Sequence, residues 1–244
     1  MNLNIHERIA KKISRAGLCS RREAENLIRN GRIKLNGEII NTPAINVSEN
    51  DIILFDNKPL QEKKNTRLWK FNKPRGYLVT NKDPKGRPII YNLLPKSLPR
   101  VISIGRLDFD TEGLILLTND GEVARQIELP STGWIRKYRV RVHGQVKQNS
   151  LENLKRGIKI GSFQTKSIEA NLDIQKGSNA WITISLKEGK NRQIRKIMEF
   201  LGHPVNRLIR ISYGPFQLGS LNKGEVLEVK NSVVLDQLWK SQIT

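Results

Sequence analysis

Cysteine and histidine are scarce in this sequence, and each shortage excludes a class of structure. Cys19 is the only cysteine in 244 residues, so a disulfide framework is excluded and a reducing compartment is expected. The three histidines, His6, His143 and His203, are scattered and cannot supply paired zinc ligands at the usual spacings. We therefore expect no metal site.

Long apolar runs are also missing. The sequence has no stretch of about 18 apolar residues that could span a bilayer, and its first residues, MNLNIHERIAKK, lack the apolar core of a signal peptide. Glycine and proline, with 18 and 10 residues, are too few for a collagen-like or low-complexity chain. These absences predict a folded, soluble, cytoplasmic protein without a membrane partner, and we expect a monomer.

Acidic residues are in a clear minority. The chain has 43 Lys and Arg against 23 Asp and Glu, which gives a formal net charge of +20. Such a field concentrates polyanions around a protein, so nucleic acid is the first partner to consider. The length predicts one large or two modest domains. Because residues 57–67 are polar and mostly charged, we place the joint there and expect domains at 1–64 and 65–244.

The first block predicts two helices followed by a hairpin. Ile5, Ile9, Ile13 and Ala16 recur at helical spacing and share one face, and Gly17 is placed to end that helix.

A second helix is predicted to begin after Ser20, which forms a capping-box pattern with Glu23, and to end near Gly31. The Asn-Gly pair at 36–37 lies between two β-rich runs and indicates a two-residue hairpin turn. A further strand is expected at 51–55.

Basic residues gather in this first block. Residues 5–34 contain nine Lys or Arg and three Glu, and such a run can simply be a solvated helix surface. Clustering on one face favours a phosphate-binding patch instead. The stretch ERIAKKISRAGLCSRREAENLIRNGRIKLNGEII resembles the small RNA-binding module of the ribosomal-protein-S-four type, over about residues 5–60. The residues expected to bind RNA are Arg8, Lys11, Lys12, Arg15, Arg21 and Arg22.

The second block alternates β-rich runs with short loops. It opens with a strand that Lys73-Pro74-Arg75-Gly76 interrupts and that resumes at 77–79, and it contains one helical pattern near 191–201. The predicted class is therefore α+β: a small helix-helix-hairpin module joined to a larger domain with a mostly antiparallel sheet.

Two segments of this block partly match ligand-binding loops but do not fit them. Asp108, Asp110, Glu112 and Gly113 match the first half of a calcium-binding loop, but Asn119 stands where a bidentate carboxylate is required. The glycine-rich segment GPFQLGS lacks the lysine of a phosphate-binding loop.

Four motifs in order, FNKPRGYLVT, GRLDFDTEGLILLTNDG, KYRV and EGKNRQIRKIMEFLGHPVNRLIR, resemble the ribosomal-RNA pseudouridine synthases that carry an N-terminal S-four-type module. The resemblance covers about residues 5–235. It implies an enzyme without cofactor or metal that isomerises a uridine within ribosomal RNA, or within a ribosome-assembly intermediate. The segment GHPVNRLIRISYGP is closer to the branch that acts on large-subunit RNA. The alternative is a non-catalytic RNA-binding protein of ribosome assembly.

The resemblance also implies roles for single residues. Asp108 of GRLD matches the catalytic aspartate, which acts at the sugar C1′ either as a nucleophile or by assisting formation of a glycal. Tyr138 matches the active-site tyrosine that stacks on the target base, and Arg195 matches the basic partner of the aspartate. The expected substrate contacts are Ile194, Lys73, Arg106 and Arg192.

Without the resemblance, the same residues also permit purely structural interpretations. Asp108 could cap a turn and pair with Arg106, Tyr138 could fill a cross-strand position in the sheet, and Arg195 could be a solvated helix charge.

Overall fold

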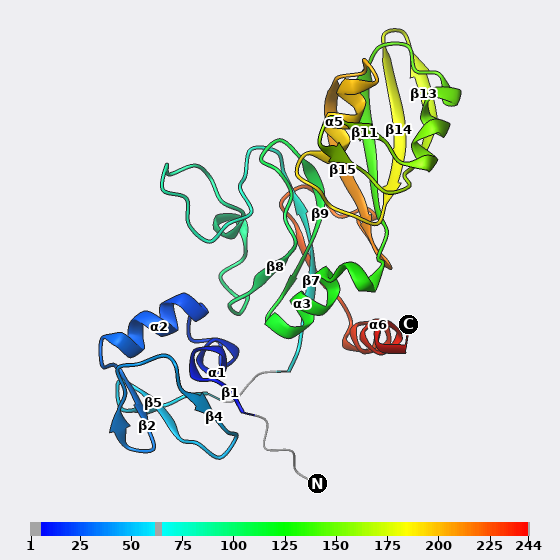
Figure 1. Ribbon diagram of the computed structural model, residues 1–244. Helices are drawn as coiled ribbons and strands as arrows, with labels where there is room; N and C mark the ends of the chain where they lie inside the picture. The colour runs from blue at the N-terminus through cyan, green and yellow to red at the C-terminus, as the bar shows by residue number, and fades with distance from the viewer. Residues whose placement is uncertain (1–5, 62–64, 244) are drawn as a thin grey trace. The chain divides into compact units, whose positions relative to one another are not determined.

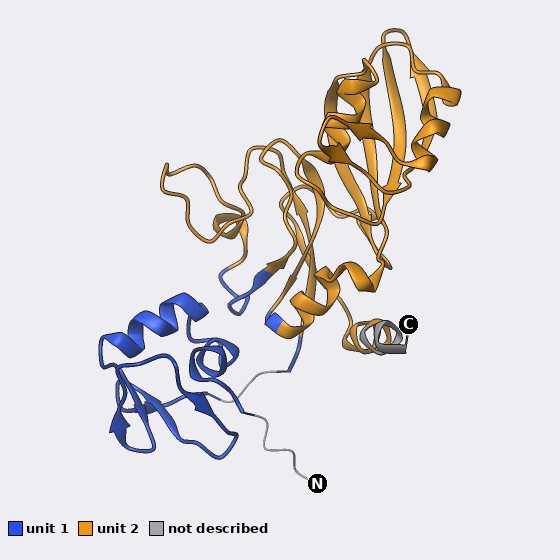
Figure 2. Cartoon of the chain, in the orientation of Figure 1, with its two compact units in different colours: residues 1–66, 96–102, 119–121 blue, residues 67–95, 103–118, 122–244 orange. Residues whose placement is uncertain are grey.

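The computed structural model describes residues 6–61 and 65–243 (Figure 1). The chain forms two compact units (Figure 2). The first comprises residues 1–66, 96–102 and 119–121, and the second comprises residues 67–95, 103–118 and 122–244. Within the described ranges, no helix is long and apolar enough to cross a membrane.

The first unit consists of two helices and two small sheets. One sheet has the strand order β3-β2-β5-β6, and the other pairs β1 with β4. Their bounds are β1 Glu7–Arg8, α1 Ile9–Arg15, α2 Arg21–Arg29, β2 Ile33–Leu35, β3 Glu38–Ile39, β4 Asn46–Val47, β5 Ile53–Phe55 and β6 Lys58–Pro59. The core includes Ile9, Ile13, Ala24, Ile28 and Ile33.

Local chemistry explains the ends of these elements. The Ser20 side chain accepts a hydrogen bond from the Glu23 backbone N–H at 3.2 Å, and the Glu23 carboxylate accepts one from the Ser20 backbone N–H at 3.3 Å, so the predicted capping box is confirmed. Asn36 and Gly37 have φ values of 50° and 92°, as the predicted two-residue hairpin turn requires.

The first helix is shorter than its periodicity predicts. It begins at Ile9, because Glu7 and Arg8 pair with Val47 and Asn46 as a short strand. Ile5, which the pattern assigned to the same helical face, lies outside the described residues.

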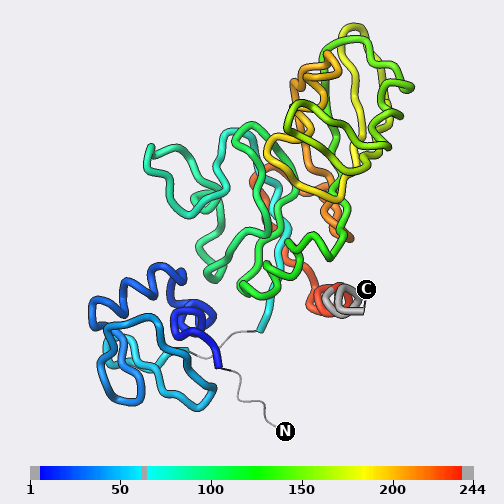
Figure 3. The backbone as a smooth tube through the Cα atoms, in the orientation of Figure 1, coloured from blue at the N-terminus to red at the C-terminus, as the bar shows by residue number. Residues whose placement is uncertain are grey.

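The second unit is built on a nine-stranded sheet. The main order is β13-β14-β10-β15-β9-β7-β17, with β16 on β15 and β8 on β9. The pairs β10–β14, β10–β15, β13–β14, β15–β16, β7–β17 and β7–β9 are antiparallel and β15–β9 is parallel, so the expected α+β class with a mostly antiparallel sheet is confirmed. The first and last strands, β7 and β17, lie side by side (Figure 3). The strands are β7 Leu68–Lys73, β8 Ile102–Ile104, β9 Glu112–Thr118, β10 Arg136–His143, β13 Glu169–Lys176, β14 Asn179–Leu186, β15 Val205–Tyr213, β16 Phe216–Gln217 and β17 Val226–Glu228.

Helices and a small hairpin complete this unit. They are α3 Gly121–Glu128, α4 Gln148–Glu152, α5 Gln193–Phe200 and α6 Asn231–Ile243, the short 3-10 turns η1 Ile90–Leu93, η2 Pro130–Thr132 and η3 Asn153–Arg156, and the strands β11 Lys159–Ile160 and β12 Phe163–Gln164. α4 and η3 pack on β13, and α5 packs on β15. The strand expected to resume at 77–79 does not form; only Leu78 makes a single bridge, to Ile89.

Alternation along β10 and β14 separates two faces of the sheet. Tyr138, Val140 and Val142 are buried, whereas Arg139 and Arg141 between them are exposed. Strand side chains alternate between faces, so β10 presents Tyr138 on the packed face and its arginines on the other face. The packed face is the one that reaches the cavity described next.

Candidate active site

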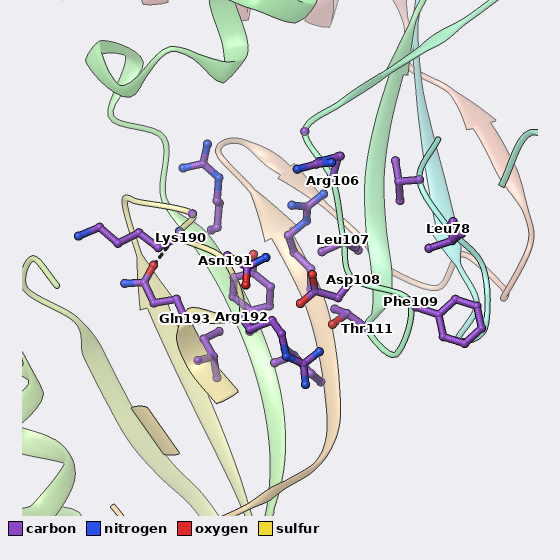
Figure 4. Close-up of a pocket in the computed structure, with 18 of the residues that line it drawn as sticks. Leu78, Arg106, Leu107, Asp108, Phe109, Thr111, Lys190, Asn191, Arg192 and Gln193 are labelled. Atoms are coloured by element: carbon purple, nitrogen blue, oxygen red, sulfur yellow. Dashed lines mark hydrogen bonds between the residues drawn. The ribbon is translucent and has the colours of Figure 1, made fainter. Parts of the chain in front are cut away.

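A cavity of about 680 Å³ lies within the second unit. Its walls come from the segment 105–111 between β8 and β9, the segment 189–194 at the start of α5, residues 78–87, and strands β10 and β15. Figure 4 shows the segment that carries Asp108 on one wall and the segment from Lys190 to Gln193 on the other.

Asp108 lies in this cavity without a side-chain partner. Its backbone carbonyl accepts a hydrogen bond from Thr111 N–H at 3.0 Å, which closes a turn. Its carboxylate makes no hydrogen bond or ion pair with any residue that the structure describes. The structural interpretation, in which Asp108 forms an ion pair with Arg106, is therefore wrong. An unpaired carboxylate facing a cavity is available to react with a bound ligand.

Lys73 holds the turn that carries Asp108. Its side chain is fully buried at the end of β7, and its ammonium donates hydrogen bonds to the carbonyl oxygens of Thr111 at 2.7 Å and Pro74 at 3.1 Å. The expectation that Lys73 contacts the substrate is thus corrected, because a fully buried ammonium cannot reach an RNA phosphate. Lys73 is a positioning residue for the segment 109–111.

Burial lowers the pKa of Lys73 to about 8, against attraction from Asp110 and Asp108, which favours the charged form. The unfolded lysine keeps its proton up to its ordinary pKa of 10.5. Between these two values the unfolded state binds more protons than the folded state, so this lysine makes the folded protein more stable as pH rises.

Replacing Lys73 by methionine should therefore destabilise the protein in a pH-dependent way. At pH 7.5 we expect a loss of about 1–3 kcal/mol, because buried carbonyl oxygens lose their donor. Above pH 8 the difference between parent and Lys73→Met should widen by about 1.4 kcal/mol per pH unit until about pH 10. Urea denaturation of both proteins at pH 7.5, 8.5 and 9.5 measures this difference, and a constant gap would contradict the assigned pKa.

The resemblance implied that Arg195 pairs with Asp108. In the structure Arg195 pairs with Asp110 instead. The guanidinium Nη2 lies 3.1 Å from the Asp110 carboxylate and 3.2 Å from the Asp110 carbonyl oxygen, and Nη1 donates to the Val205 carbonyl at 3.1 Å. Burial lowers the pKa of Arg195, and the charge of Asp110 opposes that shift. Arg195 therefore fixes the turn two residues beyond Asp108 and lies outside the cavity lining.

Four other predicted residues do line the cavity. Tyr138 on β10 and Ile194 on α5 are both mostly buried and present an aromatic ring and an aliphatic side chain to it. Arg192 caps α5 in the left-handed region, with φ of 49°, and its guanidinium lies 3.3 Å from the Asp110 carboxylate. Arg106 is exposed at the rim. The structure therefore brings Asp108 into one cavity with four of the predicted residues.

Sequence reasoning missed three cavity residues on the packed face of the sheet. Arg136 donates to the Tyr213 hydroxyl at 2.8 Å, and Arg136 and Arg210 both lie over the Tyr213 ring, at 4.5 and 5.0 Å from its centroid. The sequence signal for Arg210 is that it is the single charged residue within the apolar run LIRIS. Strand alternation alone would not have found it, because Ile209 and Ile211 lie on the other face of the strand.

Most of the six cations predicted to bind RNA form ion pairs or hydrogen bonds within the first unit. Lys11 and Arg15 both pair with Glu7, at 3.5 and 2.6 Å. The Lys12 ammonium donates to the carbonyl oxygen of Ser48 at 2.6 Å. These contacts stabilise the module, and the binding of RNA phosphates by the same three cations stays a prediction.

Arg8 is also used internally, since its Nη1 donates to the Ala44 carbonyl at 2.6 Å. Arg21 and Arg22 differ, because they are exposed and form no side-chain hydrogen bond or ion pair within the described part of the chain. They also begin α2, where the helix dipole disfavours a positive side chain but attracts an anion. Of the six predicted cations, these two remain open to a phosphate.

No group of three or more His, Cys, Asp or Glu among the described residues could hold a metal ion. The acidic residues of the segment 108–112 are instead divided between different partners. Asp110 pairs with Arg195, and Glu112 pairs with Arg207 at 2.9 Å and with Lys223 at 2.7 Å.

Comparison with known proteins gives a consistent result. Residues 67–200 match the family model described as RNA pseudouridylate synthase, and residues 7–53 match the S4 domain. An uncharacterised RNA pseudouridine synthase of Rickettsia prowazekii is 43% identical over 235 residues, which cover 95% of this chain and 97% of that protein. The ribosomal large subunit pseudouridine synthase B of Yersinia pestis is 36% identical over 222 residues, covering 87% of this chain and 69% of that protein. A crystal structure of a pseudouridylate synthase superposes with a TM-score of 0.65 at 30% identity, covering 94% of this chain and 99% of that one.

Proposed function

This chain belongs to the RNA pseudouridylate synthase family, and we propose that it isomerises one specific uridine of ribosomal RNA to pseudouridine. Large-subunit ribosomal RNA is the proposed substrate, because relatives named for that subunit are 36–37% identical to this chain. Either free ribosomal RNA or an assembly intermediate in the cytoplasm is the proposed partner of a monomeric enzyme.

The unpaired Asp108 carboxylate in the cavity carries this proposal. Isomerisation requires that uracil N1 leave C1′ and that C5 bond to C1′ in its place. An ionised carboxylate stabilises the electron-poor C1′, by bonding to it or by assisting loss of the neighbouring proton. Tyr138 supplies a ring on which the uracil stacks, and Ile194 packs against the base from α5. The four predicted groups that share the cavity with Asp108 thus fit a flipped nucleotide.

Entry of the uridine requires that it leave its stack, at a cost of about a few kcal/mol. Phosphate contacts offset that cost. In this proposal Arg106 and Arg192, which line the cavity, contact the flanking backbone. Arg21 and Arg22, which are exposed in the S4 module, bind RNA independently of the chemistry.

Mapping pseudouridine in ribosomal RNA tests the proposal directly. RNA from cells with the protein, without it, and without it but supplied with the Asp108→Asn variant should differ at one uridine. We expect that position to be modified only where the parent protein is present. Loss of modification restored by Asp108→Asn would instead support the alternative, a non-catalytic assembly protein. An unchanged pseudouridine map would contradict both ribosomal-RNA functions.

The double variant Arg21→Gln/Arg22→Gln should weaken RNA binding without slowing the chemical step. Each lost phosphate contact should lower the magnitude of the slope of log affinity against log salt by about 0.7–0.9. Filter binding at several salt concentrations and single-turnover kinetics at saturating RNA measure the two effects.

Arg29→Gln is the matched control for this variant, because Arg29 lies at the other end of α2 and pairs with Glu25 at 3.9 Å. It should leave the salt slope close to that of the parent. Equal slopes for the parent and the double variant would show that the start of α2 does not bind the RNA.

A further inference from the structure

Arg210 is a buried cation without a carboxylate partner. It lies on β15, has 2% of its surface exposed and lines the cavity that holds Asp108. Its Nε donates to the Leu114 carbonyl oxygen at 2.7 Å, and its guanidinium lies over the Tyr213 ring. Nη2 is buried and has no hydrogen-bond partner. No acidic residue in the described part of the chain forms an ion pair with it.

Such an arrangement is costly in a folded protein. A buried charge is normally paired, and a buried donor normally has an acceptor. Arg210 cannot escape the cost by losing its proton, because an arginine side chain stays charged in proteins. The cavity therefore holds a fixed, under-used positive charge in addition to the unpaired carboxylate of Asp108, and the two do not pair with each other. Binding of a negatively charged or polar ligand group would satisfy the guanidinium.

The strand pairing places Arg210 next to the residues expected to hold the base. Arg210 is directly opposite Tyr138 in the β10–β15 pair, and both side chains line the cavity. On its other side Arg210 pairs with Gly113, five residues beyond Asp108.

Gly113 makes that second pairing rigid. A Cβ atom at Gly113 would lie 2.3 Å from the Arg210 carbonyl oxygen, so only glycine allows this approach of β9 to β15. The strand that follows Asp108 is therefore fixed directly against the strand of Arg210. A base stacked on Tyr138 would have Arg210 beside it in the cavity.

We propose that Arg210 is a catalytic residue that stabilises the negative charge of the departing uracil. This inference rests on the proposed function. When the N1–C1′ bond breaks, its electron pair stays with uracil, and the charge spreads to the carbonyl oxygens O2 and O4. Arg210 donates N–H hydrogen bonds to one of these oxygens and keeps its own proton. After the base turns, C5 uses the ring electrons to bond to C1′. The C5 proton then passes to water and N1 takes up a proton from water, so the neutral aromatic ring is restored with no net change in protons.

The guanidinium is held in place from two sides. The hydrogen bond to Leu114 and the contact with Tyr213 fix it before the substrate enters. Donors that are already oriented toward developing charge are worth most in a water-poor site, where removal of one typically slows the reaction about 100-fold or more.

The competing explanation is purely structural: Arg210 could serve only to tie β15 to β9 through the Leu114 carbonyl. A structural loss would slow every substrate alike. A loss of charge stabilisation would matter less for a base that leaves more easily. RNA carrying 5-fluorouridine at the target position provides that comparison, because fluorine stabilises the base anion.

The experiment is single-turnover kinetics with the full chain at saturating RNA, following loss of uridine or 5-fluorouridine at the target position. Arg210→Met should slow the uridine reaction about 100-fold, bind RNA within about three-fold of the parent, and slow the 5-fluorouridine reaction much less. Arg210→Lys keeps the charge but lacks the two-pronged guanidinium, so its rate with uridine should lie between those of the parent and Arg210→Met. It also provides the test if the methionine variant fails to fold. Arg141→Met, which removes an exposed arginine from the opposite face of β10, should behave as the parent.

A parental rate in Arg210→Met and Arg210→Lys, or equal slowing of both substrates, would overturn the assignment. Failure of the proposed function is a separate result, since the parent protein itself would then form no pseudouridine.

Discussion

Asp108→Asn should lower the rate of pseudouridine formation by at least about 10,000-fold while RNA affinity stays within a few-fold of the parent. The substitution preserves the size of the side chain and removes the charge that acts on C1′. No ion pair is broken, because the Asp108 carboxylate has no partner among the described residues. The fold and the stability should therefore change little, which makes this variant an unusually clean test of chemistry.

The measurement is single-turnover pseudouridine formation with a preparation whose asparagine has been verified by mass spectrometry. Asp173→Asn is the matched control, because Asp173 is an exposed carboxylate on β13 that accepts a hydrogen bond from the Thr183 hydroxyl at 2.8 Å. It should react as the parent does. Substantial turnover by Asp108→Asn would remove Asp108 from its assigned role.

Patterns whose physics is local were predictable from the sequence. The capping box of Ser20 and Glu23 and the Asn-Gly turn at 36–37 depend on groups within a few residues of each other, and both form as predicted. The helix expected near 191–201 forms as Gln193–Phe200. The β-rich runs joined by short loops likewise predict the α+β class with a mostly antiparallel sheet, because a short loop can join two antiparallel strands whereas parallel strands need a long crossover.

The orientation of charged side chains was less predictable. Lys73 belongs to a basic, turn-rich segment, which is typical of an exposed loop. Tertiary packing nevertheless buries its side chain completely under the Asp108 turn. Lys12 and Arg15 lie on a basic helical stripe, but partners 36 and 8 residues away engage them. Sequence gives the presence and spacing of a charge, whereas its partner depends on elements that meet only in the folded chain.

Arg195 shows the same limit within the candidate site. Family resemblance assigns it to Asp108, and in the structure it binds both the carboxylate and the backbone carbonyl of Asp110. Asp108 and Asp110 belong to one turn. The sequence therefore assigns Arg195 to the correct segment, but to the aspartate two positions before its actual partner. Its role consequently changes from counter-charge to positioning residue.

Arg195→Met should slow the reaction at saturating RNA by about 1,000-fold through displacement of the Asp108 turn. Arg195 and Asp110 form a partly buried ion pair, with 13% and 25% of their side chains exposed, and a factor of ten in rate corresponds to about 1.4 kcal/mol of lost transition-state stabilisation. Because Arg195 lies outside the cavity lining, RNA affinity should fall much less than the rate. Lys196→Met, on the next position of α5, is the control and should keep a rate close to that of the parent.

A double-mutant cycle with Asp110→Asn separates the two possible roles of Arg195. If Arg195 acts by holding Asp110, each single variant should be strongly impaired and the double variant Arg195→Met/Asp110→Asn should be no slower than the worse single variant. If Arg195 acted on Asp108 directly, Asp110→Asn would be mild and the two effects would add. Single-turnover rates of the four proteins, with circular dichroism and thermal unfolding to confirm that each is folded, give the coupling free energy, and a value near zero would contradict the positioning role.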